Sequence, residues 1–223
     1  TFDWYIEMWN KARLHQALWN SIKVGVIASI ISTFIALFAA KAFTRYKVKF
    51  SGLSYGAILL PFIIPEIIIA VAFIVIWTSM GLKLGLIPIT ISHVLYCTPF
   101  CLLILISRME GFDKSLEEAS MDLGENAFGT FWRITLPLLL PGIVASLLLS
   151  FVISFDEFIL AFFLSSSDQT LPIYMWSQLR FPKKLPHVLA LGAIIIVATS
   201  FIVMLSYWFR NIGQSKNNKN LEI

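Results

Sequence analysis

Long uncharged runs separated by short polar segments dominate the chain. The runs predict five helices, over residues 21–40, 54–80, 86–107, 136–158 and 188–209. Each has about the 20 mostly apolar residues that a helix needs to cross the hydrocarbon core of a bilayer. None of the runs alternates between apolar and polar positions at regular turn spacing, which argues against a transmembrane β-barrel. The pattern predicts an all-α integral membrane protein with a single transmembrane domain over residues 1–223.

Prolines inside the runs change the expected shape of these helices. They are Pro61, Pro65, Pro99 and Pro141. A proline removes one N–H and clashes with the preceding turn of its helix. A membrane bundle tolerates such a kink where neighbouring helices satisfy the freed carbonyls. We therefore expect a kinked transmembrane helical bundle.

Composition excludes two other classes of protein. The hydrophobic fraction of the 223 residues is 58% and the charged fraction is 13%, whereas soluble domains carry about 25% charged residues. A disordered chain would need low hydrophobicity. The net charge of +4 fits basic cytoplasmic loops and implies no nucleic-acid partner.

The two cysteines are too few for a disulfide scaffold. Cys97 and Cys101 are four residues apart within one apolar run, which places them on one helix face. Two thiols make a poor metal site, so we expect buried structural cysteines.

Lysine and arginine positions predict the orientation. Residues 41–54 carry Lys41, Arg45, Lys47 and Lys49 without an acidic residue, which favours the cytoplasmic side. Alternation then places the loop 108–135 and the C-terminus in the cytoplasm and the N-terminus outside. Residues 1–20 lack the features of a signal peptide, so we expect a further span before residue 1.

The cytoplasmic segment 108–135 is too long for a simple connection between bundle helices. Ser115 and Glu118 form a Ser-x-x-Glu capping-box pattern, which predicts a helix beginning near Leu116. The apolar positions with helical spacing are Leu116, Ala119 and Leu123. Gly124 and Gly129 interrupt this pattern, so we expect two short helices with a glycine bend. Such a surface suits a groove on a partner protein, although a helix lying on the membrane would have a similar pattern.

This segment resembles the EAA motif of ABC importer permeases. Glu118-Ala119-Ser120 is followed after three residues by Gly124, and after nine more by Ile134-Thr135-Leu136-Pro137. The only departure is Ser120, a small residue in place of alanine. The resemblance implies that the loop docks on a cytoplasmic ABC ATPase dimer. The residues it assigns to this coupling contact are Glu118, Ala119, Ser120, Leu123, Gly124, Phe128, Ile134, Leu136 and Pro137.

Other stretches are similar to the spermidine/putrescine-type subfamily. They are Leu18-Trp19-Asn20-Ser21, Leu60-Pro61, Pro65-Glu66, His93 with Pro99, Gly111-Phe112-Asp113, Ser154-Phe155-Asp156-Glu157-Phe158 and Thr170-Leu171-Pro172-Ile173-Tyr174. The resemblance implies a six-span permease of the bacterial inner membrane that carries polyamines. It also implies a second permease, homologous or identical, and an extracytoplasmic substrate-binding protein. Permeases with similar sequences carry phosphonates, iron or opines, and these substrates stay open.

Ionisable residues within the spans are costly and so are candidates for the substrate pathway. They are Glu66, His93, Asp156 and Glu157. Carboxylates would suit a cationic substrate, because they replace water around an ammonium group. The alternatives are structural: Asp156 and Glu157 cap a helix or pair with Arg180 or Lys183, Glu66 bonds a freed backbone amide, and His93 is a buried hydrogen-bonding group.

The chain has no Gly-x-x-x-x-Gly-Lys-[Ser/Thr], no His-Glu-x-x-His and no Gly-x-Ser-x-Gly sequence. We therefore expect no enzyme activity, no cofactor and no metal site, and a separate ATPase as the energy source. An ion-coupled secondary transporter that uses Glu66, Asp156 and Glu157 is the alternative from another class. A membrane enzyme fits poorly, because the catalytic sequence patterns are missing.

Overall fold

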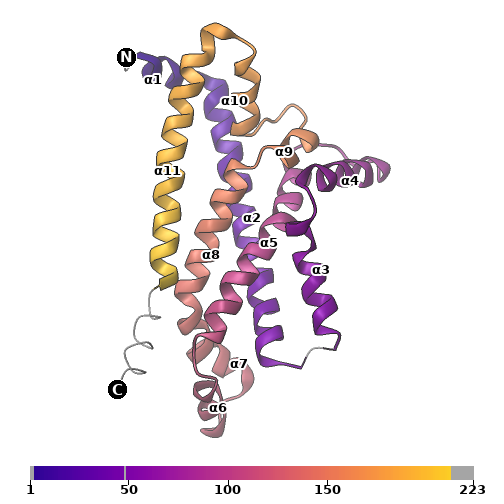
Figure 1. Ribbon diagram of the computed structural model, residues 1–223, viewed down its shortest axis with the longest axis vertical. Coiled ribbons are helices and arrows are strands. Elements are labelled where there is room, and N and C mark those ends of the chain that lie inside the picture. The colour runs from indigo at the N-terminus through magenta and orange to yellow at the C-terminus, as the bar shows by residue number, and fades with distance from the viewer. Residues whose placement is uncertain (1–2, 48, 212–223) are drawn as a thin grey trace.

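The computed structural model describes residues 3–47 and 49–211 as helices joined by short connections (Figure 1). The tail 213–223 lies outside this described part. The helices are α1 (Asp3–Trp9), α2 (Ala12–Arg45), α3 (Ser51–Ile63), α4 (Glu66–Ser79), α5 (Leu86–Glu110), α6 (Ser115–Asp122), α7 (Ala127–Thr130), the π-helix η1 (Phe131–Thr135), α8 (Leu136–Asp156), α9 (Ile159–Leu164), α10 (Leu171–Leu179), the 3-10 helix η2 (Pro182–Lys184) and α11 (Leu185–Asn211). The predicted all-α, kinked bundle is confirmed.

Four stretches of helix within the described residues are long and apolar enough to cross a membrane. They are Ala12–Arg45, Leu86–Glu110, Ala127–Asp156 and Pro182–Asn211. The pair α3 and α4 makes a fifth if it counts as one broken span. The five predicted runs therefore correspond to these five helical segments, and the second of them is not continuous.

Helices α2, α5 and α8 pack together as the centre of the bundle. Small polar side chains fill the space between them. The Cys101 thiol lies 3.6 Å from both the Ser32 and the Thr33 hydroxyls of α2. Cys97 donates to the backbone carbonyl of Ser150 in α8 at 3.6 Å. Small residues let membrane helices approach closely, so the predicted buried, structural role of the two cysteines is confirmed.

Gly25 marks a close approach between α2 and α8. A Cβ atom at this position would lie 3.1 Å from two ring carbons of Phe151. That is closer than ordinary van der Waals contact. Any larger side chain at position 25 would push the two helices apart.

Residues 54–80 form two helices instead of one kinked helix. The axes of α3 and α4 differ by 102°. Ile64 has an extended backbone, with φ −75° and ψ 133°, and Pro65 follows it. A proline disfavours helical geometry in the residue before it, so the chain leaves α3 at this point. Helix α4 then projects away from the bundle axis (Figure 1) and packs against α9.

The segment after α9 is folded and is held by α2. The Asn20 side chain donates to the Gln169 carbonyl at 3.1 Å, and the Ser21 hydroxyl accepts from the Leu171 N–H at 2.8 Å. Both side chains of α2 are buried. They hold the start of α10, so this segment is not a solvated loop.

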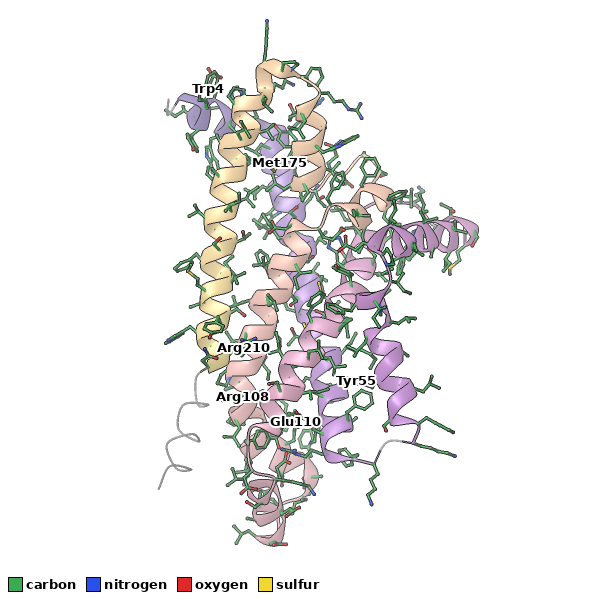
Figure 2. All side chains as sticks on the ribbon, in the orientation of Figure 1. Trp4, Tyr55, Arg108, Glu110, Met175 and Arg210 are labelled. Atoms are coloured by element: carbon green, nitrogen blue, oxygen red, sulfur yellow. The ribbon has the colours of Figure 1, made fainter. Side chains whose placement is uncertain are left out.

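The basic ends of three segments lie toward one end of the bundle. The Arg45 end of α2, the helices α6 and α7, and the Arg210 end of α11 point the same way in Figure 1. Figure 2 shows Arg108, Glu110 and Arg210 in this half and Trp4 and Met175 in the other. This arrangement agrees with the alternation of segments that the lysine and arginine positions predict.

Gly25→Leu tests the close packing of α2 and α8. We expect this substitution to destabilise the bundle by about 1 to 3 kcal/mol, as overpacking in a tight core does. Thermal unfolding of the purified protein in detergent measures the change. Gly56→Leu in α3 is the control, because its Cβ would meet no atom within 4 Å. Equal stability of the two variants would contradict the close approach at Gly25.

Candidate functional site

The loop 108–135 folds into two short helices that meet at a glycine. Gly124 follows α6 with φ +95°, a left-handed conformation that costs little for glycine. The Ser120 and Thr130 hydroxyls, 3.2 Å apart, join α6 to α7. The predicted glycine bend is confirmed.

The predicted capping box is wrong. Helix α6 begins at Ser115, and the Ser115 side chain caps nothing. Instead the Asp113 carboxylate accepts from the Ser115 N–H at 2.9 Å. This bond holds the pKa of Asp113 below its usual value. Glu118 pairs with Lys114 at 3.0 Å, one turn earlier on the helix surface, so it does not reach the helix start.

We call α6, α7 and the Gly124 bend between them the elbow. The tip of the elbow exposes apolar side chains to solvent. The side chain of Leu123 is 89% exposed and that of Phe128 is 73% exposed. Leu116 and Met121 are also exposed large hydrophobic residues. Leu116, Ala119 and Leu123 therefore do not form a buried face. A contiguous exposed apolar group is typical of a protein-interaction surface.

The nine residues that the resemblance assigns to the coupling contact divide into two groups. Glu118, Ala119, Leu123, Gly124 and Phe128 are exposed at the tip. Ser120 is half-buried between the two helices. Ile134, Leu136 and Pro137 lie at the base instead, where η1 leads into α8. The first part of the motif thus lies at the tip, and its last part lies at the base, where η1 leads into α8.

A buried ion pair fixes the elbow to the bundle. The Arg45 Nε of α2 donates to the Glu117 carboxylate of α6, and the Thr135 hydroxyl donates to the same carboxylate. Arg45 also donates to the Met109 carbonyl at 3.0 Å and lies 4.7 Å from the centre of the Phe112 ring. Sequence reasoning missed Glu117 and the partner role of Arg45. The available signal was a second acidic residue next to Glu118 in a loop that faces a basic helix end.

The second group of candidates lies where α8 breaks into α9. The Glu157 oxygens accept from the N–H groups of Leu160 at 2.9 Å and Ala161 at 3.1 Å. Glu157 is buried and caps the first turn of α9. This arrangement matches the structural alternative for Glu157.

His93 of α5 completes the support of this helix break. Its Nε2 lies 3.2 Å from the Glu157 Oε2, and its Nδ1 lies 2.7 Å from the Ser154 hydroxyl. The Ser154 hydroxyl satisfies Nδ1 as a hydrogen-bond partner, whereas Nε2 lies close to the Glu157 carboxylate without hydrogen-bond geometry. His93 is thus placed as a buried hydrogen-bonding group.

Glu66 lies at the other helix break, in the first turn of α4. Its carboxylate accepts from the Tyr96 hydroxyl of α5, instead of from a freed backbone amide. The side chain is half-buried. Glu66 thus connects the start of α4 to α5.

Asp156 is the one acidic candidate that lines a large cavity. The cavity has a volume of about 430 Å³ and lies between the end of α8, α10 and α11. Its lining includes Phe158, Met175 and Trp176, and Asp156 is the only charged residue among the residues that line it. Arg180 stacks on Trp176, 4.6 Å from the ring centre, instead of pairing with Asp156. The cavity combines one exposed carboxylate with aromatic and apolar walls.

No group of three or more His, Cys, Asp or Glu side chains in the described ranges is arranged to hold a metal ion. The candidate acids are each committed to different neighbours, with Glu157 bound to α9 and Glu66 bound to Tyr96. Of the candidate acids, Asp156 faces this cavity, and its carboxylate can accept hydrogen bonds from a cation.

Glu117→Ala tests the anchor of the elbow. Loss of one partner of a buried ion pair costs about 3 to 5 kcal/mol, and the partial exposure of the Arg45 and Glu117 side chains favours the lower end. We expect trypsin to cleave at Lys114 and Arg133 at least about tenfold faster in this variant, measured on the purified protein in detergent. Glu118→Ala is the control, because an exposed pair contributes little stability. Similar cleavage rates for the two variants would refute the anchoring role of Glu117.

Solved structures share this fold. A crystal structure of a bacterial ABC transporter that imports the acidic polysaccharide alginate aligns with a TM-score of 0.74 and 17% identity, covering 92% of this chain and 79% of that chain. A crystal structure of an amino acid ABC transporter aligns with a TM-score of 0.67 and 14% identity, covering 89% and 93%. At these identities the likeness concerns the fold alone.

Sequence comparison identifies relatives and a family. The spermidine/putrescine transport system permease protein PotC of Haemophilus influenzae is 31% identical over 207 residues, which are 92% of this chain and 80% of that protein. The putrescine transport system permease protein PotI of Escherichia coli is 25% identical over 228 residues, 98% of this chain and 80% of that protein. A family model for the binding-protein-dependent transport system inner membrane component matches residues 32–216. The chain therefore belongs to this family, the membrane permeases of ABC importers.

Proposed function

We propose that the chain forms one half of the translocation pathway of an ATP-driven importer for polyamines or a related small cationic solute. Asp156 carries this proposal, because it is the only charged residue among the described residues that line a cavity of about 430 Å³. An ammonium group binds a carboxylate through charge-assisted hydrogen bonds. Trp176 and Phe158 in the same lining offer aromatic faces, which also attract cations.

The names of the relatives support this substrate class. Both PotC of Haemophilus influenzae and PotI of Escherichia coli are named for the transport of putrescine, and PotC also for spermidine. A lone carboxylate in an apolar cavity suits a small organic cation better than it suits an anion such as a phosphonate. Glu157, His93 and Glu66 then act as positioning residues for the two helix breaks beside the pathway.

The elbow supplies the proposed contact with a cytoplasmic ATPase dimer. Leu123 and Phe128 project from its tip, on the two sides of the Gly124 bend. The Arg45–Glu117 pair connects this tip to α2, so a displacement of the tip is transmitted to the bundle. ATP hydrolysis takes place in the separate ATPase subunit, and closure of the ATPase dimer moves the elbow.

The remaining partners follow from the family. A solved relative of the fold is a bacterial alginate transporter in complex with a periplasmic protein bound to alginate pentasaccharide. We infer a binding protein that docks at the end of the bundle opposite α6, a second permease that completes the pathway, and a bacterial inner membrane in which the C-terminus faces the cytoplasm. The N-terminal residue of this sequence then lies outside, and residues 1–223 form one transmembrane domain.

Leu123→Asp and Gly124→Asp test the coupling contact. A charge placed in an apolar docking groove is costly, and an aspartate at the left-handed position 124 adds about 1 to 2 kcal/mol of backbone strain. We expect both variants to insert in the membrane but to lose ATP-driven putrescine uptake by at least about tenfold. Cells that express the complete transporter provide the uptake assay, and co-purification of the ATPase with the permease reports the contact directly.

Leu82→Asp serves as the matched control for these two variants. Leu82 is also an exposed leucine, but it lies in the connection between α4 and α5. Uptake at the wild-type rate by the Leu123 and Gly124 variants would count against the coupling role. Uptake by a preparation that lacks any ATPase would favour an ion-coupled transporter instead.

Asp156→Asn tests the cation subsite. Loss of a charge-assisted hydrogen bond weakens substrate binding by about tenfold or more, so we expect the KM for putrescine uptake to rise by that factor, and Asp156→Glu to restore part of it. Asp168→Asn in the loop before α10 is the control, since Asp168 does not line the cavity. An unchanged KM in Asp156→Asn would remove Asp156 from the pathway.

A further inference from the structure

A second cavity lies under the elbow, where α2 ends. It has a volume of about 280 Å³, far more than the roughly 30 Å³ that one water molecule takes in the liquid. Its lining combines the last turn of α2 with both short helices, and consists of Lys41, Arg45, Tyr46, Lys114, Glu117, Glu118, Met121, Ala127, Thr130 and Thr135. A group bound here would touch the bundle and the elbow together.

The described residues that line this cavity carry one more positive than negative charge. Arg45 neutralises Glu117, and Lys114 pairs with Glu118 at 3.0 Å. Lys41 forms no ion pair with any residue that the structure describes; its ammonium lies 4.3 Å from the centre of the Phe131 ring. Residues 41–54 contain no acidic residue. The cavity therefore favours an anion.

A row of aromatic rings leads to the Lys41 ammonium along the outside of α2. We call these rings, which belong to Phe34, Phe38 and Phe131, the aromatic track. Phe34 and Phe38 are exposed, and their ring centres are 4.9 Å apart. The Phe38 ring lies 6.2 Å from the Phe131 ring, over which Lys41 is placed. The three rings thus continue from the apolar flank of a membrane helix to the positive charge.

We propose that this cavity binds the phosphate headgroup of an anionic phospholipid, with one acyl chain along Phe34 and Phe38. A phosphate offers acceptor oxygens to the Lys41 ammonium and the Tyr46 hydroxyl. The aromatic track favours a lipid over a free phosphate ion, because only a lipid has a chain to cover these rings. Basic pockets between membrane helices on the cytoplasmic side are known sites for anionic headgroups.

A bound headgroup would bridge α2 and the elbow. It would contact Lys41 and Tyr46 on one side and the Met121 face of α6 on the other. This bridge would restrict the motion of the elbow relative to α2, so the lipid composition would tune coupling. That regulatory consequence rests on the proposed coupling function, whereas binding of the lipid does not.

Native mass spectrometry of the purified protein in detergent tests the binding. The probes are phosphatidylglycerol and phosphatidylcholine with identical acyl chains, and inorganic phosphate as a competitor. We expect the wild-type protein to retain phosphatidylglycerol in preference to phosphatidylcholine. Lys41→Gln should lower the phosphatidylglycerol affinity about fivefold, the usual effect of one basic residue at an anionic surface, and Lys41→Arg should restore it.

Lys23→Gln is the matched control, because Lys23 is also on α2 and also lies over an aromatic ring, that of Trp19, at 5.7 Å. The phosphatidylglycerol affinity of the Lys23→Gln variant should equal that of the wild type. Phe38→Ala should weaken retention of the long-chain lipid and leave a soluble glycerophosphate headgroup unaffected.

Three outcomes would overturn the proposal. The first is equal retention of the two lipids by the wild type, and the second is an unchanged preference in Lys41→Gln. The third is displacement of the lipid by inorganic phosphate together with no effect of Phe38→Ala, which would identify a free-phosphate site. The measurement requires neither an ATPase nor a transported solute, so a failure of the uptake predictions leaves its result unaffected.

Discussion

The hydrocarbon core of a membrane offers no hydrogen bonds to the end of a helix, and this constraint explains where the polar side chains of the bundle are used. The bundle breaks two of its helices, after Ile63 and after Asp156. At the second break, both oxygens of Glu157 replace the carbonyl partners that the first N–H groups of α9 lack. His93 lies beside this carboxylate, 3.2 Å from it, and is itself held by Ser154. A costly buried acidic group thus serves as a helix cap.

The hydrogen-bond partners of the acidic side chains distinguish the acids that hold the helices together from the acid that faces a cavity. Glu157, Glu66 and Glu117 each bind a neighbour from another helix or cap one. Asp156 directly precedes Glu157, yet it points to a cavity instead of to a backbone amide. Because the helix ends between these two residues, Glu157 completes the fold while Asp156 faces the cavity.

Local features of the fold were predictable from the sequence, whereas its long-range contacts were not. Apolar runs and a glycine bend are properties of residues close together in the sequence. The predicted helices and the bend at Gly124 therefore agree with the structure. The Arg45–Glu117 pair joins residues 72 positions apart, and no local pattern specifies such a partner. The capping prediction failed for a different reason, because Asp113 accepts from the Ser115 N–H, the donor that Glu118 would bind in a capping box. The break at Pro65 was expected as a kink, but the 102° turn depends on the packing of α4 against α9.

The bonds from α2 to the start of α10 have a consequence for biosynthesis. The contacts of Asn20 and Ser21 span 149 and 150 positions, so α2 leaves the ribosome long before residues 169–171 exist. Until then, these two polar side chains have to be shielded within the insertion machinery or by water at the membrane surface. The half of the bundle that contains the start of α10 therefore closes late, after most of the chain has been translated. A ribosome that stalls before Gln169 leaves an incompletely assembled helix for quality control.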